Sequence, residues 1–497
     1  MKLKTYILGV SLISALVASS SCSSVLDVEP QYTKDGSTLF TNLTDYQYSL
    51  TGTYSLFRQV GYYGNGSATT GAWSTLPDMM GEELLQTTED LANNATLTNY
   101  EFSTLEDDLE VMWLAGYRVI NQANITLRNI DQLQASQPKA VNRIKGQALA
   151  IRALAHFDIL RYWGADYDRN STGLGIPYTA TVNPENKPAR LTVKETYDKI
   201  YADLNAAETL LGDVDVAINT ANDRSFIDQT VVRAILARVN LYAKNYAEAE
   251  RYASLVITAR PLASKTDFPN IWKDASVSEV IWSVSFNAGE GSPANNLITS
   301  STNRNQYKPT SSIISLYDKT ADIRYSSYIG SRASGRTSVL TTDPTSTIAR
   351  KVVSKYTGKG VFTDNIVNWK AFRTGEMYLI RAEAEAMQAG KGALALADLN
   401  ALRAARINGT SALALTGTAL LDAIFLERRR ELFAEGHRWF DLKRTTRTVV
   451  RTDFNGAAAS VSSDPLPASS RVWIFPIPQA EIDANPALRS QQAPGWN

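Results

Sequence analysis

The side chains that most often do chemistry occur in this sequence mainly as adjacent carboxylates. Glu82-Glu83, Glu89-Asp90 and Asp107-Asp108 are such doublets. A glycosidase needs two carboxyl groups that face each other across the sugar bond. Neighbouring residues on a helix point in different directions, because only positions three or four apart share a face. We therefore interpret the doublets as solvated surface pairs and not as a catalytic acid and base.

Histidine and cysteine chemistry is poorly represented as well. His156 lies in an Ala-rich stretch of predicted helix with no Ser or Cys motif beside it, so we interpret it as a packed, hydrogen-bonded core residue. Two His and one Cys in the whole chain exclude a zinc site of thiolates and imidazoles. No nucleophile elbow, phosphate loop or dinucleotide motif occurs. We expect no catalytic residue, no metal site and no cofactor, although structural calcium held by carboxylates stays open.

The densest polar cluster is Glu427-Arg428-Arg429-Arg430-Glu431, followed by Glu435, His437, Arg438 and Asp441. Opposite charges three residues apart share a helical face, which predicts the pairs Glu427 with Arg430 and Arg428 with Glu431. Gly436 is expected to end this helix in a left-handed conformation. We interpret the cluster as an ion-pair network that locks the helix onto its neighbours; a binding role is the alternative.

Aromatic side chains among glycines are the other candidate for function. Tyr62, Tyr63 and Trp73 stand in the Gly-rich stretch 61–73, together with Asn65. A sugar ring stacks its C–H face on an aromatic ring while amides and carboxylates bond its hydroxyls. The alternative for each aromatic residue is ordinary core packing. The predicted ligand contacts are Tyr62, Tyr63, Asn65, Trp73, Asn287 and Tyr307.

Helices must position these residues. Aromatic and leucine residues recur at helical spacing from Thr44 to Phe57, and the further predicted helices span about 105–133, 138–163, 192–211, 228–244, 247–259, 374–389, 392–406 and 417–435. Ala237, Ala249 and Ala253 stand where two antiparallel helices approach closely, as in tetratricopeptide repeats. The segment 377–403 repeats the scheme. We predict a predominantly α fold of tetratricopeptide-like pairs that form a superhelical scaffold.

Two insertions interrupt the helices, at about 61–100 and 262–373. Residues 278–287 alternate well enough for a strand, and residues 289–305 are a Gly-, Ser- and Asn-rich loop. Loops carried by a rigid scaffold commonly bind ligands. We therefore predict an irregular, loop-rich lobe with short strands as the ligand lobe, beside a helical scaffold at about 38–60, 101–261 and 374–445 and a C-terminal segment, 446–497.

The N-terminus has the layout of an export signal. Lys2 and Lys4 precede an apolar stretch at residues 6–18, which is too short to span a bilayer and ends in small residues before Cys22. We predict a lipoprotein signal peptide at 1–21, a lipid on Cys22 that anchors the chain to a membrane, and a polar tether at 22–37. An ordinary signal peptide with an incidental Cys is the alternative, since Ser19 stands where lipoprotein sites often have Leu.

The overall charge excludes one class of partner. The chain has 50 Lys and Arg against 50 Asp and Glu. Nucleic-acid binding needs a basic field, because the phosphate backbone dominates affinity. We therefore expect no nucleic-acid partner.

Four ordered blocks resemble a known family. Residues 425–444, which read Phe-Leu-Glu-Arg-Arg-Arg-Glu-Leu-Phe-Ala-Glu-Gly-His-Arg-Trp-Phe-Asp-Leu-Lys-Arg, look like the C-terminal signature of the SusD/RagB outer-membrane nutrient-binding lipoproteins. The other blocks are 152–164 with 175–177, 188–190 and 197–204; 376–384; and 476–496. Together they extend over essentially the whole mature chain.

The resemblance implies a binding protein and not an enzyme. Members of this family are similar in fold, with four tetratricopeptide-like pairs that support a loop-rich lobe. They sit as a lid on a SusC-like TonB-dependent β-barrel transporter at the surface of the outer membrane of a Gram-negative bacterium. The helical side faces the transporter, and the loop-rich lobe captures an oligosaccharide or a peptide. A surface glycoside hydrolase and a plain tetratricopeptide scaffold lipoprotein are the alternatives.

Overall fold

The computed structural model describes residues 39–65, 71–87, 94–293, 297–299, 304–332, 340–341, 350–356, 358, 366–452, 454, 457–458 and 461–496. The chain divides into Met1–Asp45 and a compact unit, Tyr46–Asn497. The predicted signal peptide and tether, with Cys22, lie outside the described residues, so lipidation stays a prediction. No helix in the described ranges is both long enough and apolar enough to cross a membrane.

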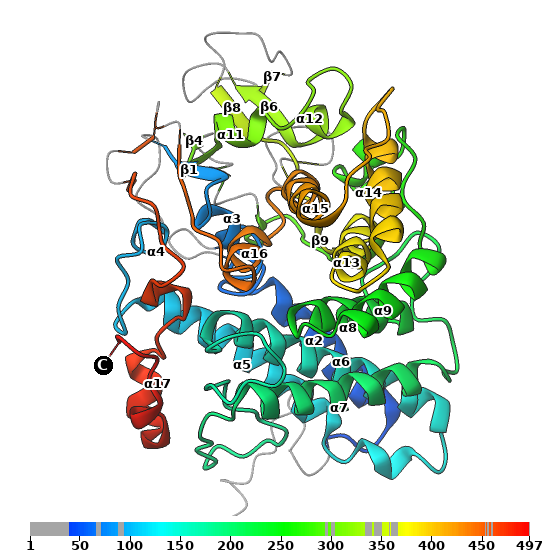
Figure 1. Ribbon diagram of the computed structural model, residues 1–497. Helices are drawn as coiled ribbons and strands as arrows, with labels where there is room; N and C mark the ends of the chain where they lie inside the picture. Colours follow the sequence, from blue (N-terminus) through cyan, green and yellow to red (C-terminus); the bar gives the residue numbers. More distant parts are fainter. Residues whose placement is uncertain are drawn as a thin grey trace, which may run out of the picture. The chain divides into compact units, whose positions relative to one another are not determined.

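Long helices that follow one another in sequence pack side by side in the lower half of Figure 1. α5 packs on α6, α6 on α7, and α8 on α9. These helices, with α2, span Leu43–Ser55 (α2), Asp107–Leu127 (α5), Pro138–Trp163 (α6), Val193–Leu211 (α7), Gln229–Tyr242 (α8) and Tyr246–Ala259 (α9). Ala237, Ala249 and Ala253 are completely buried, which confirms the predicted close approach of α8 and α9.

Local chemistry sets where these helices begin. α6 starts at Pro138, whose ring fixes φ near its helical value. Thr192 caps α7: its hydroxyl accepts from the backbone N–H of Glu195 at 3.1 Å, and the Glu195 carboxylate accepts from the backbone N–H of Thr192 at 2.9 Å. This capping box satisfies two N–H groups that a helix leaves unpaired. Asp228 caps α8 by a single bond, in which its carboxylate accepts from the backbone N–H of Val231 at 3.0 Å.

A second group of helices continues the stack and carries the C-terminal signature. It comprises α13 (Thr374–Ala386), α14 (Gly392–Arg406), α15 (Gly417–Glu431) and α16 (Arg438–Arg444). α13 packs on both α9 and α14, so the helical array is continuous. Ala382, Ala395, Leu399, Leu420 and Ile424 form an apolar core cluster among α13, α14 and α15. The predicted predominantly α fold of stacked helix pairs is confirmed.

The loop-rich region carries short antiparallel strand pairs at the top of Figure 1 and near its middle. β1 pairs with β5, β2 with β9, β3 with β4, and β6 lies between β7 and β8. The strands are β1 (Leu84–Gln86), β2 (Val280–Val284), β3 (Ile298–Thr299), β4 (Arg304–Asn305), β5 (Tyr307–Pro309), β6 (Ile329–Arg332), β7 (Leu340–Thr341), β8 (Arg350–Val353) and β9 (Trp369–Arg373). β2 confirms the strand predicted at 278–287.

In the described part of the chain, six short helices are spread among the loops, and the last of them belongs to the C-terminal segment. They are α3 (Leu76–Met79), α4 (Ala95–Thr98), α10 (Phe268–Ile271), α11 (Ser311–Ile314), α12 (Ile323–Tyr328) and α17 (Gln479–Ala484). α3 lies against α16, and α10 against α12. The loop-rich region is therefore attached to the helical array by short elements as well as by loops.

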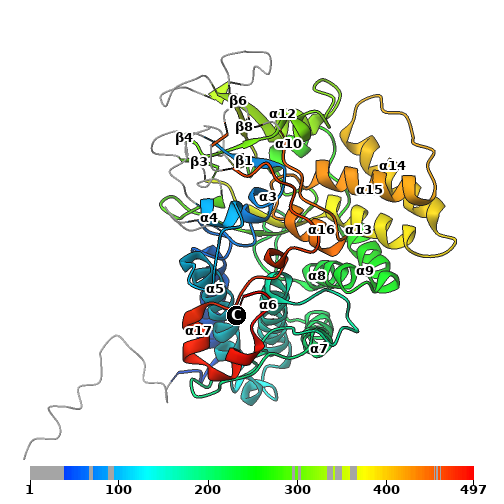
Figure 2. The same ribbon diagram turned by 60° about the vertical axis from the view of Figure 1, so that its left-hand side comes forward.

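The C-terminal segment returns to the end of α6 (Figure 2). The backbone N–H of Phe475 donates to the carbonyl oxygen of Tyr162 at 3.1 Å, and the indole N–H of Trp163 donates to the carbonyl oxygen of Pro476 at 2.8 Å. The Arg190 guanidinium donates to the carbonyl oxygen of Gln491 at 2.7 Å. This packing brings residues about 300 positions apart to one place.

Candidate functional site

The aromatic residues predicted to contact a ligand lie in the core. Tyr62, Tyr63 and Trp73 are each at most 2% exposed. The rings of Tyr62 and Trp73 lie 4.4 Å apart between centroids, and Tyr63 lies 5.0 Å from Tyr62. The hydroxyl of Tyr62 and the indole N–H of Trp73 both donate to Asp158, at 2.7 and 2.9 Å. No ring face is left for a sugar, so their assignment as ligand contacts is corrected to core packing.

Two of the other predicted contacts are buried and one is exposed. The Asn65 side chain accepts from the backbone N–H of Gly71 and donates to the carbonyl oxygen of Pro293, which ties two loops together. Tyr307 is 1% exposed in β5. Burial therefore corrects both assignments. Asn287 is exposed, with its backbone N–H bonded to the Glu290 carboxylate, and its role in binding stays a prediction.

The carboxylate doublet Glu82-Glu83 is buried, which corrects its interpretation as a solvated pair. Glu82 pairs with Arg438, and Glu83 pairs with Arg429 at 2.9 Å. Burial raises the pKa of Glu83 to about 7, although the two arginines oppose this shift. Because each carboxylate already faces a guanidinium, the doublet holds the C-terminal signature in place. Glu89-Asp90 lies outside the described residues.

The doublet Asp107-Asp108 is only partly the solvated pair that we predicted, because one of its two residues is buried. Asp107 is exposed and Asp108 is buried in the first turn of α5, where carboxylates stabilise the positive end of the helix dipole. Among the residues that the structure describes, no group of three or more His, Cys, Asp or Glu side chains is placed to hold a metal ion.

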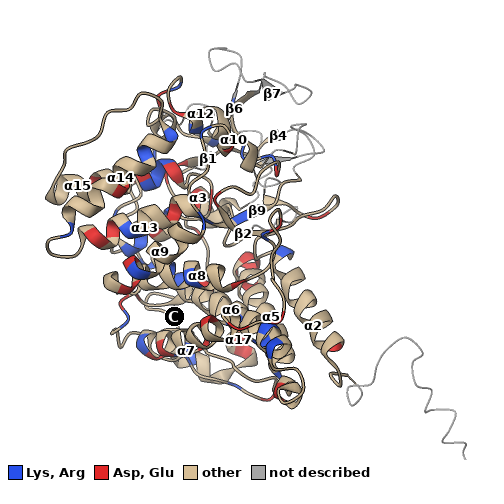
Figure 3. Ribbon diagram, turned by 90° about the vertical axis from the view of Figure 1, so that its right-hand side faces the viewer, with Lys and Arg blue, Asp and Glu red and all other residues tan. Residues whose placement is uncertain are grey.

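The charged C-terminal cluster is a buried ion-pair network, as predicted. Charges of both signs mix on α13 to α15 in Figure 3. Glu431 pairs with Arg373 at 2.9 Å, with Arg406 at 3.0 Å and with Arg324 at 3.1 Å. Burial alone would raise the pKa of Glu431, but the three arginines hold it well below its usual range. Strand β9, helix α14 and helix α12 are thereby all fastened to α15.

Of the two ion pairs predicted within this cluster, one forms and one does not. Glu427 pairs with Arg430 at 3.0 Å, as expected, but the predicted pair Arg428 with Glu431 is wrong. Arg428 binds Asp441 at 2.7 Å instead, because Glu431 is already surrounded by arginines from other elements. Sequence spacing describes only partners on the same helix, so it does not show this competition.

Gly436 has the predicted left-handed backbone, with φ of +77°. Its place in the fold differs from the prediction, because α15 already ends at Glu431. A Cβ atom at Gly436 would lie 2.5 Å from the carbonyl oxygen of Ser74. The Asp78 carboxylate accepts from the backbone N–H groups of Ala434 and Gly436. The glycine therefore lets the C-terminal signature lie directly on the segment that contains Trp73.

His156 is a core residue, as predicted. Its Nδ1 lies 2.8 Å from the carbonyl oxygen of Arg152, and its Nε2 lies 3.1 Å from the backbone N of Thr179. The ring stacks on Tyr178 with centroids 3.8 Å apart. Nδ1 donates and Nε2 accepts in this arrangement, so the imidazole is neutral. Burial lowers its pKa to about 3.

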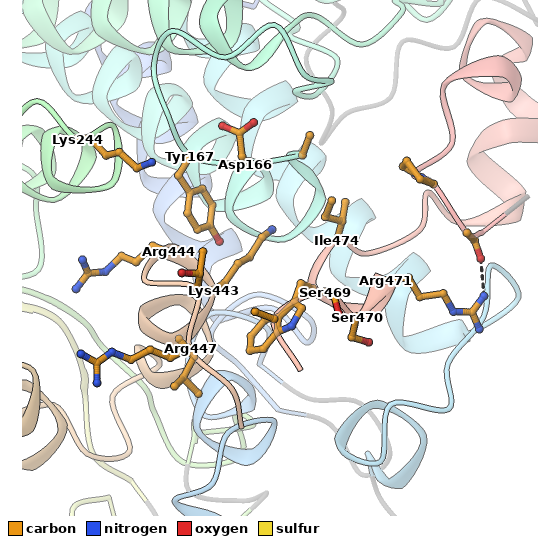
Figure 4. Close-up of a pocket in the computed structure, with 17 residues that line it drawn as sticks. Asp166, Tyr167, Lys244, Lys443, Arg444, Arg447, Ser469, Ser470, Arg471 and Ile474 are labelled. Atoms are coloured by element: carbon orange, nitrogen blue, oxygen red, sulfur yellow. Dashed lines mark hydrogen bonds between the residues drawn. The ribbon is translucent and has the colours of Figure 1, made fainter. Parts of the chain in front are cut away.

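A cavity of about 560 Å³ lies where the C-terminal segment meets the end of α6 (Figure 4). Its wall comes from the loop after α6, the turn between α8 and α9, the end of α16 and two parts of the C-terminal segment. The residues are Ala165, Asp166, Tyr167, Lys244, Leu442, Lys443, Arg444, Thr446, Arg447, Ala468, Ser469, Ser470, Arg471, Trp473, Ile474, Pro494 and Gly495. Pockets of this size hold small ligands.

Lys443 lines the cavity and also caps α6. Its ammonium donates to the carbonyl oxygens of Arg161 at 3.0 Å, Tyr162 at 3.4 Å and Gly164 at 3.2 Å. These carbonyls are among the last of the helix, which have no partner within it. Burial lowers the pKa of Lys443 to about 7, and the Asp166 carboxylate partly offsets the shift.

Sequence reasoning missed the cavity. Five cationic residues line it, against the single carboxylate of Asp166. Its wall joins segments from residue 165 to residue 495, and none of them carries a local binding motif. The only sequence signal is the position of Lys443 inside the C-terminal signature, and that signature marks the fold and not a ligand site.

Comparison with known proteins gives two matching family models. One, described as "SusD family", matches residues 325–496, and the other, described as "Starch-binding associating with outer membrane", matches residues 27–241. SusD-like protein P38 of Formosa agariphila is 24% identical over 92% of this chain and 94% of its own.

Solved structures that resemble this chain point to the same family. A SusD superfamily protein of Bacteroides thetaiotaomicron is 25% identical with a TM-score of 0.78, over 91% of this chain and all of its own. A protein of Bacteroides vulgatus whose description is sugar-binding is 26% identical with a TM-score of 0.72, over 92% of this chain and 99% of its own. Taken with the stacked helix pairs and the buried C-terminal signature, these matches show that the chain belongs to the SusD family.

Proposed function

We propose that the protein is a non-catalytic, lipid-anchored protein of the bacterial outer surface that captures an oligosaccharide and passes it to a SusC-like TonB-dependent transporter. The observation that carries the proposal is the match of residues 27–241 to the family described as starch-binding and associating with the outer membrane. The full-length likeness to a protein described as sugar-binding supports it. A lipid on Cys22 would keep the bound sugar at high effective concentration near the transporter.

The described residues also favour binding over catalysis. Glycoside hydrolysis needs two opposed carboxyl groups with room for the sugar between them. The buried carboxylates Glu82, Glu83 and Glu431 each face an arginine. Such pairs hold the fold together, and none of these three carboxylates is free to protonate a glycosidic oxygen.

A glycan screen tests the capture step. The purified mature protein is titrated calorimetrically with neutral and acidic oligosaccharides and with peptides, and each mixture is then analysed by chromatography. We expect at least one oligosaccharide to bind and to be recovered intact. Release of shorter sugars would contradict the proposal in favour of a hydrolase, and binding of peptides alone would assign a different cargo.

The anchor and the partner are tested in cells. Cys22→Ala should move the protein out of the membrane fraction, whereas Ser23→Ala, beside it, should leave it there. Affinity purification of the tagged protein after mild detergent extraction should recover a TonB-dependent barrel. Recovery of the protein without any barrel would contradict the transporter partnership.

A further inference from the structure

The cations at this cavity outnumber the carboxylates that could neutralise them. Lys443 bonds only to backbone carbonyls, and within the described residues no carboxylate forms an ion pair with it. Arg190 also bonds to a carbonyl at the end of α6, that of Trp163, and burial lowers its pKa to about 10. The negative end of a helix dipole amounts to only about half a charge. The charge of Arg190 alone exceeds this half charge, and Lys443 adds positive charge to the extent that it is protonated, so the end of α6 beside the cavity is positive.

Lys244 is the cation best placed to reach a ligand. Figure 4 shows Lys244 and Lys443 directed toward Asp166 and Tyr167, while the guanidinium ends of Arg444 and Arg447 point away. Arg444 and Arg447 are engaged by Glu383 and Asp422 outside the wall. Lys244 pairs with Asp168 only at 3.8 Å, and its side chain is about half exposed. Breaking so weak a surface pair costs little.

Asp166, the one carboxylate of the wall, is occupied by its own loop. One of its oxygens accepts from the backbone N–H of Asp168 at 2.9 Å, and the other accepts from the hydroxyl of Ser171 at 2.5 Å. These bonds use the carboxylate to shape the loop after α6. It therefore does not neutralise Lys244 or Lys443 by direct contact.

The rest of the wall suits a sugar. The hydroxyl of Tyr167 and the indole N–H of Trp473 are bonded to the carbonyl oxygens of Arg161 and Pro467, so both rings add carbon to the wall. The hydroxyls of Ser469 and Ser470 stand at the cavity without a protein partner among the described residues. Ring carbon faces the C–H groups of a sugar, and hydroxyls bond its hydroxyls.

We propose that this cavity binds the acidic group of a charged sugar, a carboxylate or a sulfate, next to Lys244 and Lys443. The sugar part of this inference rests on the proposed function. The cavity thereby adds an acidic-sugar site at the C-terminal segment, apart from the loop-rich lobe to which the sequence pointed.

The test compares two acidic sugars with a neutral ester and with an anion that has no sugar. The mature protein, purified in detergent with its lipid, is titrated at low ionic strength with galacturonate, galacturonate methyl ester, galactose 6-sulfate and sodium sulfate. We expect both acidic sugars to bind at least about tenfold more tightly than the ester, with an affinity that falls as salt is added. Equal affinity for the acid and its ester would overturn the proposal. Sulfate binding as tightly as the sugars would reduce the site to a plain anion site and overturn it too.

Variants locate the binding. Lys244→Gln should weaken the acidic sugars about three- to tenfold and leave the ester unchanged. Lys139→Gln is the matched control, because Lys139 is an exposed lysine in a surface ion pair elsewhere; it should have no effect. Ser469→Trp fills the cavity from an exposed position and should abolish binding of the acidic sugars while the melting temperature is kept. Unchanged binding in both Lys244→Gln and Ser469→Trp would overturn the proposal.

The two proposals fail in different ways. A neutral oligosaccharide found in the glycan screen should bind the Ser469→Trp variant as tightly as the original protein. If the Ser469→Trp variant loses binding of the acidic sugars but keeps binding of the neutral oligosaccharide, the result bears on the cavity proposal alone. Failure of every oligosaccharide to bind the unmodified protein would contradict the proposed function itself.

Discussion

The indole of Trp73 makes three contacts that an alanine cannot replace. It packs on Tyr62, lies 6.0 Å from Tyr162 between ring centroids, and donates to the Asp158 carbonyl. We expect Trp73→Ala to lower the free energy of unfolding by about 3 to 5 kcal/mol, because a buried cavity replaces the ring. Urea denaturation of the purified protein measures this. Tyr48→Ala is the control, since Tyr48 is 73% exposed on α2; a similar loss in both variants would contradict the core assignment.

The lowered pKa of the buried His156 leads us to expect that the stability of the protein depends on pH. Its folded pKa, about 3, lies below the ordinary value of 6.5. Between these values the unfolded chain binds a proton that the folded protein excludes, so the free energy of unfolding falls as the pH drops below about 6.5. The slope that one such group adds approaches about 1.4 kcal/mol per pH unit.

Removing the imidazole isolates this contribution. Unfolding by urea is measured from pH 4.5 to 7 for the original protein and for His156→Asn, which has no titrating group at this position. The variant should be less stable at pH 7 but should show a shallower slope. Burial and nearby arginines also lower the pKa of His437, so part of the slope should persist. Identical slopes in the two proteins would contradict a neutral His156.

Single side chains show where sequence reasoning stops. His156 was assigned correctly because its neighbours on the same helix are apolar. Tyr62 was assigned wrongly, because the carboxylate that accepts the hydrogen bond from its hydroxyl belongs to Asp158, 96 residues away. Glycines around an aromatic residue indicate a loop, but they do not show whether another part of the fold covers that loop.

At the level of elements, the sequence pattern predicts where the helices lie but overestimates how far some of them extend at their C-terminal ends. The predicted span 138–163 is that of α6. The helix predicted at 105–133 ends at Leu127, and Asn129 adopts a left-handed backbone with φ of +62°. The helix predicted to 435 ends at Glu431, before Ala434 with φ of +57°. An apolar pattern continues through such turns, so periodicity alone overestimates the helix length.

Because Glu431 attaches α15 to three neighbouring elements, we expect the loss of its charge to destabilise the protein. Glu431→Gln would leave Arg324, Arg373 and Arg406 without their shared carboxylate in a buried site. Removing one partner of a buried ion pair typically costs about 3 to 5 kcal/mol, and we expect a loss of that order in the free energy of unfolding.

An exposed pair on another helix provides the comparison. Asp198 pairs with Lys194 on α7, and both side chains are more than half exposed. Asp198→Asn should change stability by less than about 1 kcal/mol. Both variants are measured by chemical denaturation at pH 7. A loss at Glu431 no larger than that at Asp198 would mean that the network does not hold α15.

For the whole molecule, buried ion pairs and hydrogen bonds join the helical array to the loop-rich region. Arg238 of α8 binds Glu376 of α13 at 2.6 Å and donates to the carbonyl oxygen of Ala371 in β9. β9 also pairs with β2, and its Arg373 reaches Glu431 of α15. One strand therefore links the lower helices, the loop-rich region and the C-terminal signature. The sequence indicated each part, but not that β9 joins them.

This linkage predicts cooperative unfolding of residues 46–497 as one unit. Long chains often unfold in steps when their parts have separate cores, but here β9 cannot leave without breaking contacts on both sides. Thermal unfolding followed by far-ultraviolet circular dichroism reports the helices. Its midpoint should coincide with that of tryptophan fluorescence, which reports the packing of buried indoles in both regions, such as Trp163 in α6 and Trp369 in β9. Arg238→Met, which removes the ion pair but keeps an apolar chain over Phe372, should lower and separate the two midpoints. Two distinct midpoints in the unmodified protein would show that the regions fold independently.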